Sequence, residues 1–484
     1  MFGGSSMESF EKLRPVGRLE RYSTARHDLK FYLGPAVTAS YKLPKSHSER
    51  LKERIYKALG DVITRHPILS SIVVDEHTQD PHFIRLPEID LDKCVHFQAR
   101  HLNYDADADG ERDVELDELL SAQHGVPYEP PSPFWRVYIL TSSVHPSHFT
   151  VSFFYHHAIG DGNSGMAFHR TFHTALSQSL SIPPSDLSST SIILSPSTPL
   201  LPSLESLHPL PVSTWHLLTI LFKHKIWSSR DPGLWTGFKC TTPLGRPGAR
   251  HLAFSASATT AFKNICREND TTITGALQTL IAGALFAHLP EKFTKVACSG
   301  ALSARRFLPA DAGITDDSMG VWVLDMSDTY ARDCFVPHGD PEKGVCDLLP
   351  WTEAQRSRQN IERVLSLKGH NAGVGMLRYV NDYQQELFVS KVGKDRDSSF
   401  ELSNLGLFKP AGRVEGDSGV EIGRMVFTQS AGVTASAIEV SVVTGADGCL
   451  VLGVTWQKGI VEDDLVENVI KSVKEEVKRL GGHD

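Results

Sequence analysis

A tract rich in serine and proline divides this chain near its middle and constrains how the chain can fold. Serine and proline supply 18 of the 35 residues from Ser177 to Pro211. Such a composition buries too little apolar surface to form a core of its own. The chain has 484 residues, whereas one core rarely serves more than about 250. We therefore expect two domains, residues 1–210 and 211–484, with the tract as the crossover between them.

Both halves of the chain show the same mixture of strand and helix patterns. Apolar residues recur at helical spacing over residues 50–66 and 270–289, whereas the runs at 134–142 and 149–157 indicate two strands of a hairpin. A second hairpin signal, centred on Ala-Asp-Gly, precedes a final helical pattern. The sequence therefore predicts an α/β protein of the mixed, α+β kind, with antiparallel strands and flanking helices in each half.

Charge and cysteine usage exclude several classes of protein. The chain carries 49 basic and 57 acidic side chains, a formal net charge of −8. Nucleic-acid binding depends on a basic field, so we expect no nucleic-acid partner, and any phosphate ligand needs a local basic patch. The seven cysteines are widely spaced without a C-x-x-C pair, and no apolar leader opens the sequence. We expect a cytoplasmic protein.

The segment that follows the tract, residues 212–227, is apolar with a few basic residues. It is too short to cross a bilayer, which takes roughly 20 apolar residues. Two interpretations stay open: a helix packed on the protein surface, which we favour, and a basic amphipathic helix at a membrane interface. The second interpretation would bring the protein into peripheral contact with a membrane.

The run FFYHHAIGDGNSG, residues 153–165, lies between the predicted hairpin and a helix predicted at 166–180. Its glycines spell G-x-G-x-x-G, which is typical of dinucleotide-binding proteins. However, Asp161 would direct a carboxylate at the pyrophosphate, and the preceding strand belongs to a hairpin rather than to a βαβ unit. We therefore reject a dinucleotide site.

The histidines of this run allow two further interpretations. His156, His157 and Asp161 are competent metal ligands, but neighbouring residues of a strand point to opposite faces, so we predict no metal. Strand alternation instead places His157 on the apolar face. A neutral imidazole in a dry cleft can take a proton from a hydroxyl or an amine. His157 is therefore our candidate general base.

These residues resemble a known family. His156-His157-Ala158-Ile159-Gly160-Asp161-Gly162 matches the H-H-x-x-x-D-G signature of the CoA-dependent acyltransferase superfamily, which includes chloramphenicol acetyltransferase, peptide-synthetase condensation domains and plant BAHD acyltransferases. Gly17-Arg18-Leu19-Glu20 with Tyr22, and Ser403-Asn404-Leu405-Gly406, are similar to the fungal alcohol acetyltransferase branch. The resemblance covers nearly the whole chain.

The resemblance implies two chloramphenicol-acetyltransferase-like domains with a tunnel between them, entered from opposite ends by acyl-CoA and the acceptor. It implies that His157 deprotonates the acceptor hydroxyl, while His156, Asp161 and Gly162 shape the loop. Asp161 would pair with an arginine of the second domain and take no part in the chemistry. Acetyl-CoA would be a co-substrate, with no permanently bound cofactor.

The same resemblance suggests further site residues in the second half. SGALSARRFLP offers Arg305 and Arg306 as the partner of Asp161, and the spacing to Leu308-Pro309 favours Arg305. The plant D-F-G-W-G motif is missing, so Ser403 or Asn404 is our candidate for stabilising the oxyanion, unless this segment is only a turn. One preorganised donor can supply on the order of 3 kcal/mol.

The sequence therefore predicts a CoA-dependent O-acyltransferase, moving acetyl from acetyl-CoA to a small-molecule alcohol such as a secondary-metabolite hydroxyl. We expect a direct reaction in a ternary complex without an acyl-enzyme, because no G-x-S-x-G elbow is present. We also expect a monomer. Three alternatives stay open: another acyl-CoA donor, an amine acceptor, and a non-catalytic binding scaffold. The sequence names neither the acceptor nor the residues that hold the phosphates of CoA.

Overall fold

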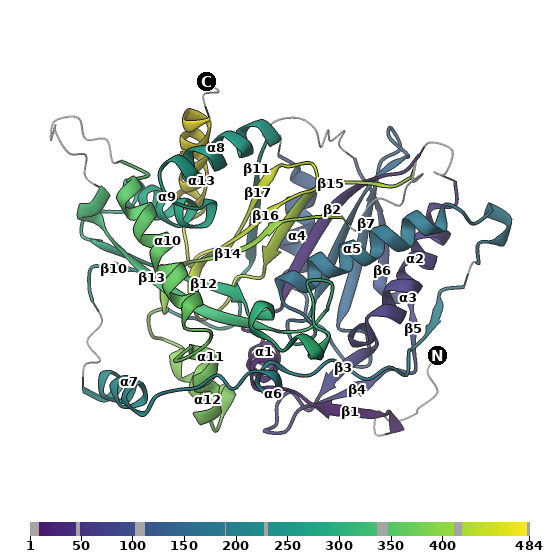
Figure 1. Cartoon of the computed structure of the whole chain (residues 1–484), viewed down its shortest axis with the longest axis horizontal. Coiled ribbons are helices and arrows are strands. Elements are labelled where there is room, and N and C mark those ends of the chain that lie inside the picture. Colours follow the sequence, from purple (N-terminus) through teal and green to yellow (C-terminus); the bar gives the residue numbers. More distant parts are fainter. Residues whose placement is uncertain are drawn as a thin grey trace.

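The computed structural model describes residues 9–44, 49–101, 112–188, 190–226, 231–335, 347–410 and 419–481. Two large β-sheets, each flanked by helices, form the body of the molecule (Figure 1). The first sheet has five strands in the order β15-β2-β8-β7-β6. Its strands are β2 (Pro35–Lys42), β6 (Val95–Ala99), β7 (Trp135–Thr141), β8 (His148–Tyr155) and β15 (Glu421–Gln429).

The second sheet has seven strands in the order β10-β12-β14-β16-β17-β11, with β13 paired to β12. Parallel pairing joins β14 to both β12 and β16, and antiparallel pairing joins β16 to β17 and β17 to β11. The strands are β10 (Leu234–Trp235), β11 (Pro247–Phe254), β12 (Lys295–Ser303), β13 (Val323–Ala331), β14 (Ser398–Leu407), β16 (Ser436–Thr444) and β17 (Leu450–Gln457). The mixed α/β class that the sequence predicts is confirmed.

Helices cover both sheets. On the first sheet α2 packs against α5, and beside the second sheet α9 packs against α10, α13 and α8 (Figure 1). The longer helices are α1 (Arg18–Asp28), α2 (Leu51–Arg65), α4 (Val114–Gln123), α5 (Gly162–Ser179), α7 (Thr214–Ile226), α8 (Ala256–Glu268), α9 (Ile273–His288), α10 (Trp351–Ser366) and α13 (Asp463–Leu480). The short ones are α3 (Leu91–Cys94), α6 (Leu204–Leu207), α11 (Gly373–Met376) and α12 (Tyr383–Leu387).

Smaller sheets complete the first half of the chain. One has the order β1-β4-β3, with β1 (Lys12–Pro15), β3 (Ser71–Val74) and β4 (His82–Arg85). The other pairs β5 (Glu88–Asp90) with β9 (Ile192–Leu194), a strand of the Ser/Pro tract. The tract therefore runs along the first half as an extended connection with only short elements.

One strand of the second half completes the first sheet. β15 pairs antiparallel with β2, from Glu421 opposite Lys42 to Gln429 opposite Pro35. It also packs against β16 and β17 of the second sheet. The two halves of the chain are thus connected by a shared sheet as well as by the crossover. The domain boundary at residue 210 stays a prediction.

Several predicted elements are present, with shifted ends near the motif. The helices predicted at 50–66 and 270–289 are α2 and α9, and the predicted hairpin is β7–β8. The strand predicted at 149–157 ends earlier, at Tyr155, because the chain turns: the Ile159 N–H donates to the carbonyl of His156 over 3.1 Å. Both histidines therefore lie in a loop and not on the strand.

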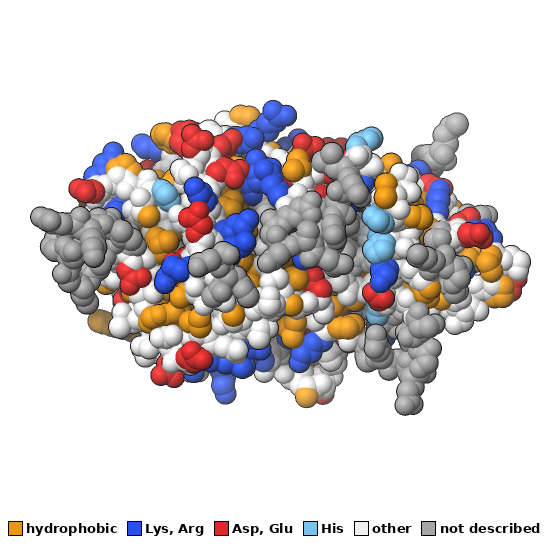
Figure 2. All heavy atoms as spheres, turned by 90° about the horizontal axis from the view of Figure 1, so that it is seen from above, with side chains coloured by type: hydrophobic (Ala, Val, Ile, Leu, Met, Phe, Trp, Pro, Cys, Tyr) orange, Lys and Arg blue, Asp and Glu red, His pale blue; other side chains and the backbone are white. Residues whose placement is uncertain are grey.

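The surface carries no dominant charge on the face that Figure 2 shows, where basic and acidic side chains are intermingled. Among the described residues, no helix is both long enough and apolar enough to span a bilayer. Helix α7 lies at one end of the molecule, away from both large sheets (Figure 1).

Candidate active site

The loop from His156 to Asp161 connects the central strand β8 to helix α5. Asp161 is the N-cap of α5, where its Oδ1 accepts hydrogen bonds from the backbone N–H and the hydroxyl of Ser164 at 3.0 and 3.1 Å. The Tyr155 hydroxyl donates to the carbonyl of Asp161 over 2.7 Å. The helix therefore begins at Gly162, four residues before the predicted start, because an N-cap carboxylate satisfies its first free N–H groups.

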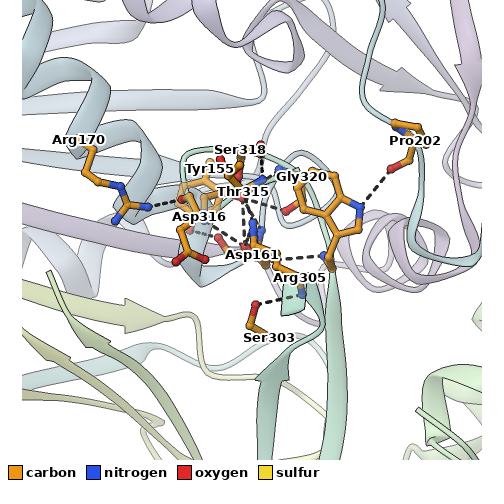
Figure 3. A network of polar contacts seen from close by, with 12 residues as sticks. Tyr155, Asp161, Arg170, Pro202, Ser303, Arg305, Thr315, Asp316, Ser318 and Gly320 are labelled. Atoms are coloured by element: carbon orange, nitrogen blue, oxygen red, sulfur yellow. Dashed lines mark hydrogen bonds and ion pairs between the residues drawn. The ribbon is translucent and has the colours of Figure 1, made fainter. Parts of the chain in front are cut away.

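Asp161 and Arg305 form a buried ion pair that joins the two halves of the chain (Figure 3). The guanidinium donates Nη1–H to Oδ2 over 2.7 Å and Nη2–H to Oδ1 over 2.9 Å. Oδ2 also accepts from the backbone N–H of Trp322 at 3.1 Å. Burial opposes the charged carboxylate, but Arg305 and these hydrogen bonds still lower the pKa of Asp161. Because both oxygens are occupied, Asp161 is a structural anion and not a base.

The partner arginine extends from a short 3-10 turn, Arg305–Phe307, that follows β12. Its neighbour Arg306 is exposed and does not reach Asp161. Gly162 lies where α5 meets the second half, since a Cβ there would stand 2.5 Å from Leu405 Cδ2 and 3.1 Å from Phe427 Cζ. A glycine at this position allows the start of α5 to approach β14 and β15 closely.

His157 has the properties that a general base requires. Burial, reinforced by the positive charge of Arg26, lowers the pKa of His157 to about 3, so the ring is neutral at pH 7. The residue keeps partial exposure, but its Nδ1 is buried and has no hydrogen-bond partner among the described residues. Its ring lies 5.8 Å from that of Tyr32, centroid to centroid. Because Nδ1 is buried, Nε2 is the ring nitrogen that can accept a proton from a substrate.

His156 is buried more deeply than His157, contrary to the strand alternation that placed His157 on the apolar face. Its Nδ1 accepts the backbone N–H of Ala158 at 2.9 Å. Burial lowers the pKa of His156 to about 4. His156 thus serves the shape of the loop, and its remaining ring nitrogen faces Glu76, at 3.1 Å.

The two candidate oxyanion residues, Ser403 and Asn404, lie within β14, although the sequence suggested a turn after the strand. The Asn404 side chain donates to the hydroxyl of Thr274 over 3.0 Å and accepts the N–H of Gly406 at 2.8 Å. Its amide is therefore engaged in local structure. Ser403 is buried and, as the strand neighbour of Asn404, points to the opposite face of the sheet.

A polar network that no local motif indicates begins at the hydroxyl of Tyr32. The Tyr32 hydroxyl donates to Gln429 Oε1 and the Gln429 amide donates to Glu401, both over 3.1 Å. Glu401 lies opposite Glu439 in the β14–β16 register, and burial raises the pKa of both carboxyls. These residues come from the segment between α1 and β2 and from β15, β14 and β16, so only the fold brings them together.

A cavity of about 780 Å³ opens beside the motif. The first turns of α5 and the ends of β12 and β14 line it, and its polar wall includes Asn163, Arg170, Ser303, Arg306, Thr315 and Asn404. Arg170 is engaged by Asp317 and by the carbonyl of Asp316, as Figure 3 shows for Asp316. Arg306, in contrast, forms no ion pair with any of the described residues.

Solved structures place this fold in a known class. The trichothecene 15-O-acetyltransferase of Fusarium sporotrichioides superposes with a TM-score of 0.69, at 15% identity, over 97% of this chain and 95% of that one. The condensation domain of the monacolin K polyketide synthase superposes with a TM-score of 0.60, at 12% identity, over 98% of each chain. The chain therefore has the two-domain fold of CoA-dependent acyltransferases and condensation domains.

Sequence comparison narrows this class. The family model described as "Alcohol acetyltransferase" matches residues 15–475. A probable alcohol acetyltransferase of Aspergillus fumigatus is 36% identical over 471 residues, covering 94% of this chain and 97% of the relative. Another, of Fusarium pseudograminearum, is 25% identical over 483 residues, covering 94% and 93%. The chain belongs to the alcohol acetyltransferase family, which confirms the resemblance and the predicted class of enzyme.

Proposed function

We propose that this enzyme transfers acetyl from acetyl-CoA to a hydroxyl group of a small secondary metabolite, with His157 as the general base. The observation that carries the proposal is the neutral, partly exposed imidazole of His157 in the loop that ends at the buried Asp161–Arg305 pair. The names of the relatives support an alcohol acceptor, and the trichothecene 15-O-acetyltransferase is an example that acetylates a hydroxyl of a secondary metabolite.

The proposed reaction takes place in one complex of enzyme and both substrates. His157 accepts the proton of the acceptor hydroxyl as its oxygen attacks the thioester carbonyl of acetyl-CoA. The resulting tetrahedral oxyanion collapses and expels the thiolate of CoA, which takes the proton from the imidazolium. Every proton is thus returned, and no acyl-enzyme forms. Ser403 is the proposed donor to the oxyanion: it does not line the cavity, but the amide of the cavity residue Asn404 is engaged by Thr274 and Gly406.

The cavity of about 780 Å³ is the proposed site for the phosphate-bearing part of acyl-CoA, since its lining includes Asn163, directly after the motif, but not His157. A chain with a net charge of −8 needs a local cation for the phosphates of CoA. Arg306 provides such a cation at the cavity wall, whereas the charge of Arg170 is already balanced by Asp317. Arg306 is therefore the proposed phosphate contact.

The test of the proposed function uses His157→Ala with a panel of alcohols and amines. Loss of a general base typically costs 10²- to 10⁴-fold in rate, so we expect thiol release from acetyl-CoA to fall by about that factor. Binding of acetyl-CoA, measured by calorimetry, should persist. Wild-type turnover by His157→Ala would exclude the base. If the wild type preferred amines or a longer acyl-CoA, the proposed acceptor or donor would be wrong. If it bound acetyl-CoA without turnover, the protein would be a non-catalytic scaffold.

A peripheral membrane contact through α7 is a separate proposal. Trp215, Leu218 and Phe222 recur at helical spacing on one face, with 78%, 58% and 55% of their surfaces exposed. The helix contains no acidic residue, and its sequence includes Lys223 and Lys225. An exposed apolar face on a basic helix favours an anionic lipid surface.

The cytoplasmic location and the monomeric state of the protein stay predictions.

Vesicle sedimentation tests this contact. The wild type should sediment with vesicles that contain phosphatidylserine and less with pure phosphatidylcholine, and the triple replacement of Trp215, Leu218 and Phe222 by serine should abolish the difference. Val144→Ser is the matched control, because Val144 is also exposed, at 62%, but lies in the β7–β8 turn. Equal sedimentation of the triple variant would exclude α7 as the contact.

A further inference from the structure

Three titratable side chains from separate parts of the first half, those of His27, Glu76 and His156, lie in contact with one another. The Glu76 carboxylate lies 2.9 Å from Nδ1 of His27, in the last turn of α1, and 3.1 Å from Nε2 of His156. Their side chains are 12%, 5% and 1% exposed, respectively. The two imidazole rings lie 4.2 Å apart, edge to face, and Phe134 stacks on His156 at 4.9 Å. The cluster is thus enclosed by aromatic rings.

The outer nitrogens of the two imidazoles reveal where the protons lie. The backbone N–H of Tyr128 donates to Nε2 of His27 over 3.1 Å, and that of Ala158 donates to Nδ1 of His156 over 2.9 Å. A neutral imidazole has one N–H donor and one acceptor. Both rings therefore carry their proton on the nitrogen that faces Glu76.

Glu76 is consequently an anion solvated by two neutral imidazoles. Although burial alone would raise its pKa, His156 and His27 lower the pKa of Glu76 to about 2. The contact to His27 is a hydrogen bond, whereas the contact to His156 is bent away from ideal hydrogen-bond geometry. The carboxylate thus bridges α1 to the loop that carries the motif.

The same three side chains form a set that could ligate a divalent metal ion. The proton positions oppose this alternative. A metal-bound histidine normally donates its second N–H outward, whereas here both outer nitrogens accept hydrogen bonds. The nitrogens that face Glu76 therefore hold protons and have no lone pair to offer a metal.

His157 depends on this arrangement for its position. In a Ser-His-Asp triad a carboxylate orients the catalytic imidazole directly, but Nδ1 of His157 has no such partner among the described residues. Its orientation must come through the backbone on either side. Asp161 anchors one side, and on the other His156 is held by the Phe134 carbonyl, at 2.8 Å from its N–H, and by Glu76.

We propose that Glu76 and His27 are positioning residues for acyl transfer, which hold the ring and tautomer of His156 and thereby the peptide that carries His157. The inference rests on the proposed function of His157 as the base. It assigns a role to two residues outside the motif, both of them distant from it in sequence.

Glu76→Gln is the principal test. The glutamine amide keeps the shape of Glu76 but has one acceptor oxygen instead of two. Its NH₂ group would then face the N–H of one of the two imidazoles, so that two hydrogen-bond donors oppose each other. A displacement of about 1 Å at a catalytic group can cost 10²-fold, so we expect kcat to fall roughly 10- to 100-fold. The KM for acetyl-CoA should change less than twofold, because the cluster does not line the cavity. Wild-type kcat would overturn the proposal.

Two companion variants distinguish positioning from a general loss of structure. Glu76→Asp keeps the charge and both acceptors, and should lose less kcat than Glu76→Gln. In the double variant His27→Gln, Glu76→Gln, the new carbonyl at position 27 can accept the amide N–H, so kcat should partly recover. A greater loss in Glu76→Asp than in Glu76→Gln, or strictly additive losses in the double variant, would overturn the proposal. If Glu76→Gln does not fold, a wild-type kcat in His27→Gln alone would overturn it.

Two parallel measurements separate this inference from its premise. His157→Ala measured alongside decides the proposed function: if it keeps wild-type turnover, the base is wrong whatever Glu76→Gln does. If His157→Ala is inactive and Glu76→Gln is not impaired, only the positioning role fails. Elemental analysis of the purified wild type should find no stoichiometric transition metal, and one metal ion per chain lost in Glu76→Gln would overturn the protonated cluster.

Discussion

Two buried ionic clusters lie on either side of His157, and they differ in how their charge is balanced. Asp161 faces a full opposite charge, the guanidinium of Arg305, through two parallel hydrogen bonds. Among the residues that the structure describes, Glu76 faces only the N–H groups of His27 and His156. The first cluster is a balanced ion pair, whereas the second is a single anion held by dipoles.

The two clusters also differ in what they connect. The Asp161–Arg305 pair joins residues 144 positions apart, from opposite halves of the chain. The Glu76 cluster joins α1, the segment after β3 and the motif loop, all within the first half. The Asp161 end of the motif therefore depends on the association of the two halves of the chain. The His156 end depends on the packing of the first half alone.

Breaking the ion pair should have the largest effect. Arg305→Ala leaves Asp161 buried without a partner, and removal of one member of a buried pair costs about 3–5 kcal/mol. We expect the free energy of unfolding to fall by about that amount in chemical denaturation, with loss of acetyl transfer. Arg306→Ala is the matched control and should unfold like the wild type. The reverse order of the two variants would contradict the pairing seen here.

As the pH falls, the cluster of His27, Glu76 and His156 should lose its contribution to stability before the Asp161–Arg305 pair does. The pKa of His156 is about 4 in the folded protein and 6.5 without the fold, so the unfolded chain binds the proton more readily. The stability that neutral His156 contributes is present above pH 6.5 and lost as pH falls toward 4, on the order of 3 kcal/mol. Other buried histidines with lowered pKa act in the same direction: His66, His124, His157 and His169.

The ion pair should respond at lower pH. The pKa of Asp161 is lowered below its ordinary value of 3.8, so its contribution is present above that value and lost only as pH falls further. Unfolding by denaturant at pH 7, 6, 5, 4 and 3 would show the order. Constant stability from pH 6.5 to 5 would contradict the neutral, buried state of the histidines.

A change at Gly162 should sharpen the comparison with a smaller effect. Gly162→Ala places a Cβ 2.5 Å from Leu405 Cδ2, a contact that the leucine side chain can only partly relieve. Overpacking of this kind typically costs about 1–3 kcal/mol. The variant should lose stability and turnover together, because it pushes the two halves apart beside the ion pair. A wild-type melting temperature and kcat would show that the contact between the halves tolerates this displacement.

Arg306→Ala should have the smallest effect, confined to one substrate. An exposed charge contributes about 0.2–1 kcal/mol, so we expect the KM for acetyl-CoA to rise up to about fivefold while kcat and stability stay unchanged. Steady-state kinetics at low ionic strength would measure the change. An unchanged KM would remove Arg306 from the proposed phosphate contact and leave both clusters unaffected.

The motif was largely accessible from the sequence because its chemistry is local. The histidine pair, the N-cap Asp161 and the close approach at Gly162 lie within seven residues, where turn and capping rules apply. The exact end of β8 was not accessible, since the turn after Tyr155 depends on a hydrogen bond between His156 and Ile159. The sequence also could not show that the amide of Asn404 is engaged by Thr274, because the two residues are 130 positions apart.

Short-range patterns in the sequence were enough for the mixed fold class, because they encode strands, helices, turns and caps. The type of enzyme followed from the resemblance of the motif to a known family. Only the tertiary structure decided that β15 completes the first sheet and that His27 and Glu76, 49 residues apart, meet at His156. The physical reason is that such contacts depend on which strands pair and which helices pack, and a lone glutamate or histidine carries no local mark of that arrangement.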